Sequence, residues 1–249
     1  LDRELRYTPG DLWLVAAATG VGKSTLLQEM ERRATVPTIF FSVEMSRQQL
    51  MDRTISANAG IDSWKIRRGA LSPSELAMVM AEVDDYERRD DHLLVDNAGL
   101  TTAAMESVLR IASVRFGVRI AYLDYIQRLA DKGDSEYARV TAISNAVARI
   151  ARQTGVNIVA AAQVNRQSKD GEPPRKSDLR DSGYLEQDAA AILALGRAEG
   201  STDVKLIVRK SRSGLEGYTV DFVFDAFHSR ILETSEARMR DASPVGADS

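Results

Sequence analysis

A glycine-containing segment near the start of the chain has the residue types that bind phosphate. It reads Ala17-Ala18-Thr19-Gly20-Val21-Gly22-Lys23-Ser24 and is followed by Thr25. Backbone N–H groups in such a segment can surround phosphate oxygens, while the next helix directs the positive end of its dipole at them. The Lys23 ammonium would reach the β- and γ-phosphates, and the Ser24 hydroxyl would bind Mg²⁺. The spacing predicts a P-loop that binds a nucleoside triphosphate through residues 18–25.

The neighbouring residues provide the structural context that a P-loop needs. The apolar run 12–16 predicts a strand before it, and Leu26, Leu27 and Met30 recur at helical spacing after it. Ala17 stands where the first glycine of the pattern is usual. The alternative is a glycine-rich turn with an unrelated lysine, but the order of strand, loop and helix favours the P-loop.

Three polar residues stand at the ends of apolar runs that predict strands. Asp124 directly follows 118–123, Gln163 directly follows 156–162, and Glu44 comes two residues after 37–42. In an open parallel sheet the ligand lies beyond the carboxyl ends of the strands. Asp124 would hold Mg²⁺ opposite Ser24, and Gln163 would contact the γ-phosphate.

Hydrolysis also needs a group that orients or deprotonates the attacking water. Many P-loop ATPases place a glutamate directly after the magnesium aspartate, but Tyr125 occupies that position here. Glu44 is therefore the candidate base, on a strand that a simple winding would place beside the P-loop strand. The structural alternatives are that Glu44 is a surface residue starting a helix and that Asp124 caps a turn.

Apolar strands and amphipathic helices alternate along most of the chain. One helix begins at the capping box Ser72-Pro73-Ser74-Glu75, and Leu76, Val79, Met80 and Val83 share one of its faces. This alternation predicts an α/β fold, a mostly parallel sheet flanked by helices on both faces. The closing strands are predicted at 189–195, 204–208 and 218–224, the last two joined as a hairpin across 210–217.

Composition restricts the function classes. The 249 residues carry a formal charge of −3 and include no cysteine, which excludes a generally basic nucleic-acid binder and a Cys-ligated metal site. The sequence contains neither an apolar run of membrane-spanning length nor a secretory signal, so we expect a cytoplasmic protein with no membrane partner. Residues 164–182 predict a long basic functional loop, and 234–249 a disordered tail.

Several motifs in sequence order resemble the C-terminal motor domain of DnaB-type replicative helicases, within the RecA-like ATPases. They are residues 17–24 (AATGVGKS), 41–46 (FSVEMS), 123–127 (LDYIQ), 162–166 (AQVNR), 177–183 (SDLRDSG) with 186–188 (EQD), and 210–214 (KSRSG). The resemblance covers about residues 1–232. It implies a RecA-like P-loop NTPase core with a C-terminal β-hairpin, a domain over 1–233, and a hexameric ring with ATP and Mg²⁺ between neighbouring subunits.

The resemblance also assigns roles to individual residues. The family's catalytic glutamate falls on Glu44, its magnesium aspartate on Asp124 and its phosphate-sensing glutamine on Gln163. The finger that reaches the neighbour's ATP falls on Arg212, with Lys210 beside it. From the sequence alone, without the family resemblance, Lys210 and Arg212 would be basic residues of an exposed turn.

The family's contacts with the single-stranded DNA backbone fall on Arg180, Asp181 and Gly183. Because six loops converge on one strand, such contacts need little net positive charge per subunit. Asp181 stands where the family usually has Glu, and Ser213 where Asn is usual. The alternative for Arg180 is a surface ion pair.

The resemblance implies a 5′–3′ DNA helicase that binds single-stranded or replication-fork DNA, with primase or a helicase loader as further partners. The family's N-terminal collar and linker helix are not recognised in the sequence. We therefore expect an excised domain or a short protein from a bacterial, phage or mobile-element context. The alternatives are a recombinase-type DNA-dependent ATPase, and a nucleotide-gated helicase loader or partner with little turnover.

Overall fold

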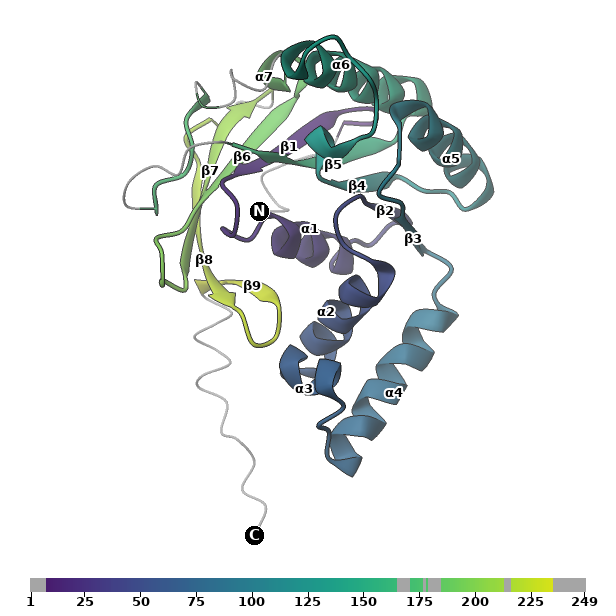
Figure 1. The fold of residues 1–249 in the computed structure, drawn as a ribbon, viewed down its shortest axis with the longest axis vertical. Coiled ribbons are helices and arrows are strands. Elements are labelled where there is room, and N and C mark those ends of the chain that lie inside the picture. Colours follow the sequence, from purple (N-terminus) through teal and green to yellow (C-terminus); the bar gives the residue numbers. More distant parts are fainter. Residues whose placement is uncertain (1–7, 165–170, 177, 179–184, 213–215, 235–249) are drawn as a thin grey trace.

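The computed structural model describes residues 8–164, 171–176, 178, 185–212 and 216–234. Within them the strands are β1 (Leu12–Ala17), β2 (Thr38–Ser42), β3 (His92–Asp96), β4 (Ile120–Asp124), β5 (Asn157–Gln163), β6 (Ala191–Gly196), β7 (Asp203–Ser211), β8 (Thr219–Asp225) and β9 (Arg230–Glu233). They form one sheet in the order β3-β2-β4-β5-β1-β6-β7-β8-β9 (Figure 1). The first six in this order are parallel, and β7, β8 and β9 are antiparallel. The predicted mostly parallel sheet with a C-terminal hairpin is confirmed.

Helices lie on both faces of this sheet, as predicted (Figure 1). In the described residues they are α1 (Lys23–Arg32), α2 (Arg47–Ala59), α3 (Ser63–Arg68), α4 (Pro73–Arg88), α5 (Thr102–Arg115), the 3₁₀ turn η1 (Ile126–Arg128), α6 (Glu136–Thr154) and α7 (Leu185–Asp188). α1 packs on one face against β1, β4 and β5, and α6 packs on the other face against β1 and β5. The central strands are therefore covered by helices on both faces of the sheet, which explains their continuous apolar sequences.

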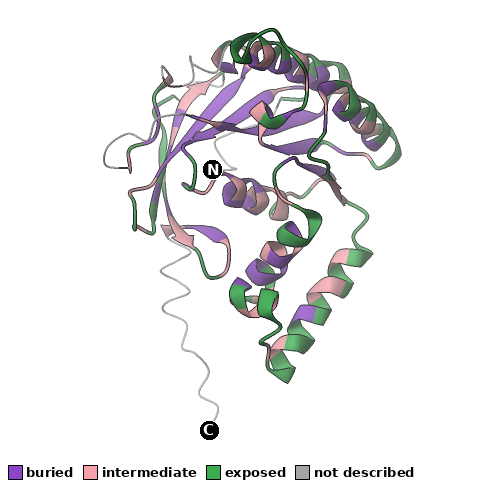
Figure 2. Cartoon of the chain, viewed as in Figure 1, coloured by how far each residue is buried: buried purple, intermediate pink, exposed green. Residues whose placement is uncertain are grey.

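The hydrophobic core follows these central strands (Figure 2). Every residue of β1 and β4 is buried, and so is β5 up to its last residue. No helix of the described part is long and apolar enough to cross a membrane. Asp124, at the end of β4, is a buried charged residue at the edge of this core, and the site below uses it.

Helices α2, α3 and α4 form a separate small cluster beside the sheet. Its buried residues are Ile55, Ile61 and Val79. The capping box of α4 is present, because Ser72 Oγ accepts from the Glu75 N–H and the Glu75 carboxylate accepts from the Ser72 N–H. Leu76 and Met80, expected on a buried face, are 50% and 53% exposed. The reason is that α4 packs against α2 and only a narrow stripe of it is covered.

Three features differ from the sequence-based expectations. α3 and β9 were not predicted. The prediction that the strand before Glu44 lies next to the P-loop strand is wrong, because β4 and β5 lie between β2 and β1. The expected exposed turn around Lys210 is also corrected, since β7 continues to Ser211 and the Lys210 side chain is partly buried.

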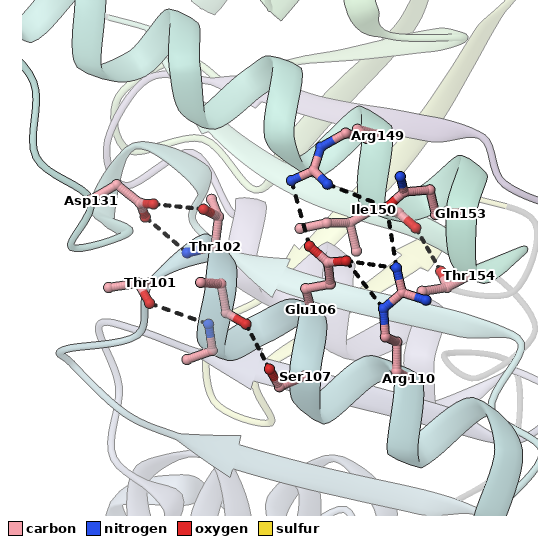
Figure 3. A network of polar contacts seen from close by, with 12 residues as sticks. Thr101, Thr102, Glu106, Ser107, Arg110, Asp131, Arg149, Ile150, Gln153 and Thr154 are labelled. Carbon is pink, nitrogen blue, oxygen red and sulfur yellow. Dashed lines mark hydrogen bonds and ion pairs between the residues drawn. The ribbon is translucent and has the colours of Figure 1, made fainter.

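Polar contacts join α5, α6 and the segment after β4 (Figure 3). The Glu106 carboxylate accepts from Arg110 at 2.7 Å and pairs with Arg149 at 3.5 Å. At the start of α5, the Asp131 carboxylate accepts from the Thr102 backbone N–H at 2.9 Å and from its hydroxyl at 2.6 Å. The Glu106 contacts thus join α5 to α6, and the Asp131 contacts hold the segment after β4 at the start of α5.

Candidate active site

The P-loop connects the end of β1 to the start of α1. Gly22 directly precedes α1 with φ +122°, a backbone conformation that residues with a Cβ rarely adopt. A Cβ at Gly22 would lie 3.2 Å from the Ile231 Cδ1 atom of β9 and 3.4 Å from the Phe224 ring of β8. The C-terminal strands thus pack directly against the P-loop.

Lys23 folds back over this segment. Its Nζ donates to the carbonyl oxygens of Ala17 at 2.9 Å and Ala18 at 2.8 Å. Burial lowers the pKa of Lys23 to about 8, although the nearby Asp124 and Glu44 carboxylates act in the opposite direction. A phosphate group would replace these carbonyl oxygens with a stronger, charged acceptor.

Asp124 ends β4, and its side chain is a buried carboxylate. The residue is 1% exposed, and among the described residues neither carboxylate oxygen has a partner at normal hydrogen-bond geometry. Burial raises the pKa of Asp124, while the nearby Ser24 hydroxyl and Lys23 ammonium lower it. A buried carboxylate left unpaired beside a serine hydroxyl fits a hard cation such as Mg²⁺.

Glu44 lies next to Asp124 through the pairing of β2 with β4. Ser42 and Asp124 are register partners, and the Val43 N–H donates to the Asp124 carbonyl oxygen at 3.0 Å. Glu44 follows immediately and is exposed. Its carboxylate is close enough to raise the pKa of both Lys23 and Asp124. The predicted base thus reaches the site although its strand is not adjacent to β1.

Gln163 ends β5 beside the P-loop. It is the register partner of Ala17, the last residue of β1. The structure therefore brings together at one edge of the sheet the P-loop, Asp124, Glu44 and Gln163, as the sequence predicted.

Arg197 and Phe224 were missed by the sequence analysis and lie against the P-loop. Arg197, directly after β6, donates to the Gly20 carbonyl oxygen, and its guanidinium carbon lies 4.3 Å from the centroid of the Phe224 ring. Both residues line a cleft of about 590 Å³ formed by the β6–β7 and β8–β9 connections. Arg197 directly follows the apolar run of β6, and this position at a strand end could have indicated that it belongs to the site.

A larger hollow of about 660 Å³ lies elsewhere, at β3 and the helices α4 and α5. None of the predicted catalytic or phosphate-binding residues lines it. This hollow is therefore separate from the P-loop edge of the sheet.

Lys210 and Arg212 lie at the opposite edge of the sheet. Ser211 pairs with Ala191, Ala191 pairs with Trp13, and the Arg212 N–H donates to the Ala190 carbonyl oxygen at 3.1 Å. These are residues at the amino ends of β1 and β6. The six residues of β1 separate them from the P-loop by about 20 Å of strand.

Lys210 is held within its own subunit. Its Nζ donates to the carbonyl oxygens of Glu186 at 2.6 Å and Gln187 at 3.2 Å, and burial lowers its pKa. The predicted DNA contacts Arg180, Asp181 and Gly183 lie outside the described residues, as do Ser213 and most of the tail.

The fold and this edge of the sheet define a P-loop NTPase domain of the RecA-like class. A family model described as DnaB-like helicase C terminal domain matches residues 1–233, and the chain belongs to that family. The resemblance seen in the sequence motifs is thus confirmed.

Two curated relatives are named replicative DNA helicase DnaB. The one from Treponema pallidum is 32% identical over 91% of this chain, and the one from Leifsonia xyli is 30% identical over 90%. The chain spans 52% of the length of each of these relatives.

Two solved structures share the fold. One is described as an ATPase domain and superposes with a TM-score of 0.80 at 25% identity, covering 91% of this chain and 86% of that one. The other, a DnaB-like replicative helicase described together with its interactions with primase, gives 0.79 at 25% identity, covering 91% of this chain and 58% of that one.

Proposed function

We propose that this chain is an ATP-hydrolysing motor domain that works in a hexameric ring, translocates on single-stranded DNA and unwinds duplex 5′ to 3′. The observation that carries the proposal is the separation of Arg212 from the catalytic carboxylates by the length of β1. A subunit cannot combine these groups alone, but two subunits in head-to-tail contact can. Head-to-tail contacts that close produce rings.

The residues at the P-loop edge support ATP hydrolysis. Mg²⁺ held by the Ser24 hydroxyl and the Asp124 carboxylate would neutralise charge on the β- and γ-phosphate oxygens. Lys23 would exchange its two carbonyl acceptors for phosphate oxygens. Glu44 accepts a proton from water as the water oxygen bonds to the γ-phosphorus and the bond to the β-phosphate oxygen breaks, giving ADP and inorganic phosphate.

Gln163 and the basic pair complete the reaction. The Gln163 amide would contact the γ-phosphate and respond to its loss. Arg212 would approach the γ-phosphate bound to the neighbouring subunit and stabilise charge in the transition state. Lys210 would join it by exchanging its bonds to the Glu186 and Gln187 carbonyl oxygens for phosphate oxygens. A cation supplied in this way accelerates phosphoryl transfer by about 10³ to 10⁵.

The cleft beside the P-loop is the proposed site of the nucleoside. The Arg197 guanidinium lies over one face of the Phe224 ring, and the base would stack on the outer face of this pair. Because Arg197 also donates to Gly20, occupation of the cleft would be sensed by the phosphate-binding loop.

For DNA, we keep the contacts that the family resemblance implies, Arg180, Asp181 and Gly183. Backbone contacts of this kind recognise single strands without reading sequence. Primase or a helicase loader is a further proposed partner, and one structural relative is described with primase. A motor that acts in replication is expected to work in the cytoplasm.

The proposal is tested by steady-state ATP hydrolysis against protein concentration, with and without single-stranded DNA. Turnover that rises steeply with concentration and is stimulated by DNA is expected. Open filaments by electron microscopy would favour the recombinase-type alternative. Slow hydrolysis that depends on neither the protein concentration nor single-stranded DNA would favour the nucleotide-gated loader and contradict the proposal of a motor domain.

A further inference from the structure

The side chain of Gln127 forms hydrogen bonds with the backbone of Gln163, at a point on β5 that lies beyond the end of its pairing with β4. The β4–β5 register ends at Leu123 and Ala160, yet β5 continues to Gln163. Gln127 Nε2 donates to the Gln163 carbonyl oxygen at 2.9 Å, and the Gln163 N–H donates to Gln127 Oε1 at 3.1 Å. A carboxamide offers the same donor and acceptor as a peptide group, so it takes the place of the next strand residue.

The last residue of β5 is therefore held from both sides. On one side it is in register with Ala17 of β1, and the Val164 N–H donates to the Ala17 carbonyl oxygen at 3.2 Å. On the other side it has only the Gln127 amide among the described residues. Without that amide, the strand end next to the γ-phosphate position would lose its support on the β4 side.

Gln127 is itself fixed by its neighbours. The Arg139 guanidinium donates to the carbonyl oxygens of Gln127 and Leu129, each at 2.8 Å. The Ala130 N–H donates to the Leu100 carbonyl oxygen at 2.8 Å, and Asp131 binds Thr102 (Figure 3). The amide thus projects from a short segment that is anchored at several points and starts at Asp124.

We propose that Gln127 is a positioning residue for ATP hydrolysis, which sets the backbone of Gln163 relative to Asp124. The inference rests on the proposed function, since Gln163 is taken to contact the γ-phosphate. Gln127 is not among the proposed nucleotide contacts, since its amide binds the Gln163 backbone. It links the strand that holds the magnesium aspartate to the strand that carries the phosphate sensor.

A double-mutant cycle of Gln127→Ala and Gln163→Ala tests this role in the whole chain. Gln127→Ala should lower kcat about tenfold and leave the Kd for a slowly hydrolysed ATP analogue unchanged, because the P-loop is untouched. In the Gln163→Ala background, Gln127→Ala should have no further effect. If the two losses multiply instead, Gln127 acts independently of Gln163 and the proposal is overturned.

Two further variants separate positioning from general destabilisation. Gln153→Ala removes a glutamine on α6 that binds only arginines in the described structure and should leave kcat unchanged. Gln127→Glu keeps the acceptor for the Gln163 N–H but, when ionised, cannot donate to the carbonyl oxygen. Because an unperturbed glutamate is largely ionised between pH 5.5 and 8, this variant should lose about as much activity as Gln127→Ala. Full activity in Gln127→Glu would contradict the role of the donated hydrogen bond.

Hydrogen exchange measured on peptides containing Gln163 gives a readout that does not need hydrolysis. Exchange at this amide should speed up several-fold in Gln127→Ala and stay unchanged in Gln153→Ala. Unchanged exchange in Gln127→Ala would refute the positioning role of Gln127 without affecting the proposed function. A wild-type chain that does not hydrolyse ATP would instead contradict the proposed function.

Discussion

Arg212 lies 3.7 Å from Asp11, measured from Nη1 to Oδ1, at the beginning of the same strand whose other end carries the P-loop. Its side chain is 62% exposed and lies at the edge of the sheet that has no phosphate-binding groups among the described residues. Arg212 is therefore too far along β1 to reach a nucleotide bound at the P-loop of the same chain. The proposed ring gives it a role at the P-loop of a neighbouring subunit.

Arg212→Ala should reduce ATP hydrolysis by about 10³-fold or more while ATP still binds, because the binding groups lie at the opposite edge. An exposed ion pair such as that with Asp11 contributes little to stability, so the melting temperature should not change. Arg115→Ala, at the exposed end of α5, is the matched control and should retain activity. Hydrolysis and nucleotide binding are measured side by side; full activity in Arg212→Ala would refute the finger assignment.

Asp124→Asn should raise the stability of the folded protein at neutral pH and abolish ATP hydrolysis. Burial raises the pKa of Asp124 above the unfolded value of about 3.9, so the folded protein binds more protons than the unfolded protein just above that pH. The stability contributed by this group is present below about pH 3.9 and is lost as the pH rises through the folded pKa. Without Mg²⁺, the variant should therefore melt higher than wild type at pH 7, and the difference should shrink toward pH 4.

The same variant should fail to hydrolyse ATP, and Mg²⁺-ATP should raise the melting temperature of wild type but not of Asp124→Asn. Thermal unfolding between pH 4.5 and 8, with and without Mg²⁺-ATP, measures both effects. Asp134→Asn, an exposed substitution of the same kind, is the control. Equal stabilisation of wild type and Asp124→Asn by Mg²⁺-ATP would remove Asp124 from the magnesium site.

Phe224→Ala should weaken ATP binding about tenfold through loss of stacking in the cleft. Inorganic triphosphate, which has no base, should be affected much less. Competition of ATP and triphosphate against a fluorescent nucleotide measures the two affinities. Phe116→Ala, directly after α5, should change neither affinity. An equal loss for both ligands in Phe224→Ala would mean that Phe224 only supports the P-loop.

The sequence was sufficient to predict the residues that end the central strands. Asp124 and Gln163 follow continuous apolar runs, and in a parallel sheet covered on both faces such runs end at one edge. Strand order was not accessible in this way. The position of β2 beyond β4 and β5 is a long-range property that no local pattern encodes. The prediction that the Glu44 strand lies beside the P-loop strand was therefore wrong, while the predicted position of Glu44 at this edge of the sheet was right.

Contacts between distant residues explain what was missed. Arg197 binds Gly20 across 177 positions of sequence, and Gln127 binds Gln163 across 36. Neither contact leaves a periodic signature in the chain. β9 is only four residues long and α3 only six, lengths at which periodicity is weak.

Subunit mixing tests the shared active site most directly. Lys23→Ala and Arg212→Ala are each expected to be inactive, the first for lack of a phosphate-binding group and the second for lack of the neighbour's cation. In a 1:1 mixture, about a quarter of the interfaces combine an intact P-loop with an intact finger, so activity should return to about that fraction of wild type. A mixture of Lys23→Ala with Glu44→Ala, whose defects lie on the same side of the interface, should stay inactive. If the first mixture assembles into rings and remains inactive, the two edges of the sheet do not form one site and the account is wrong.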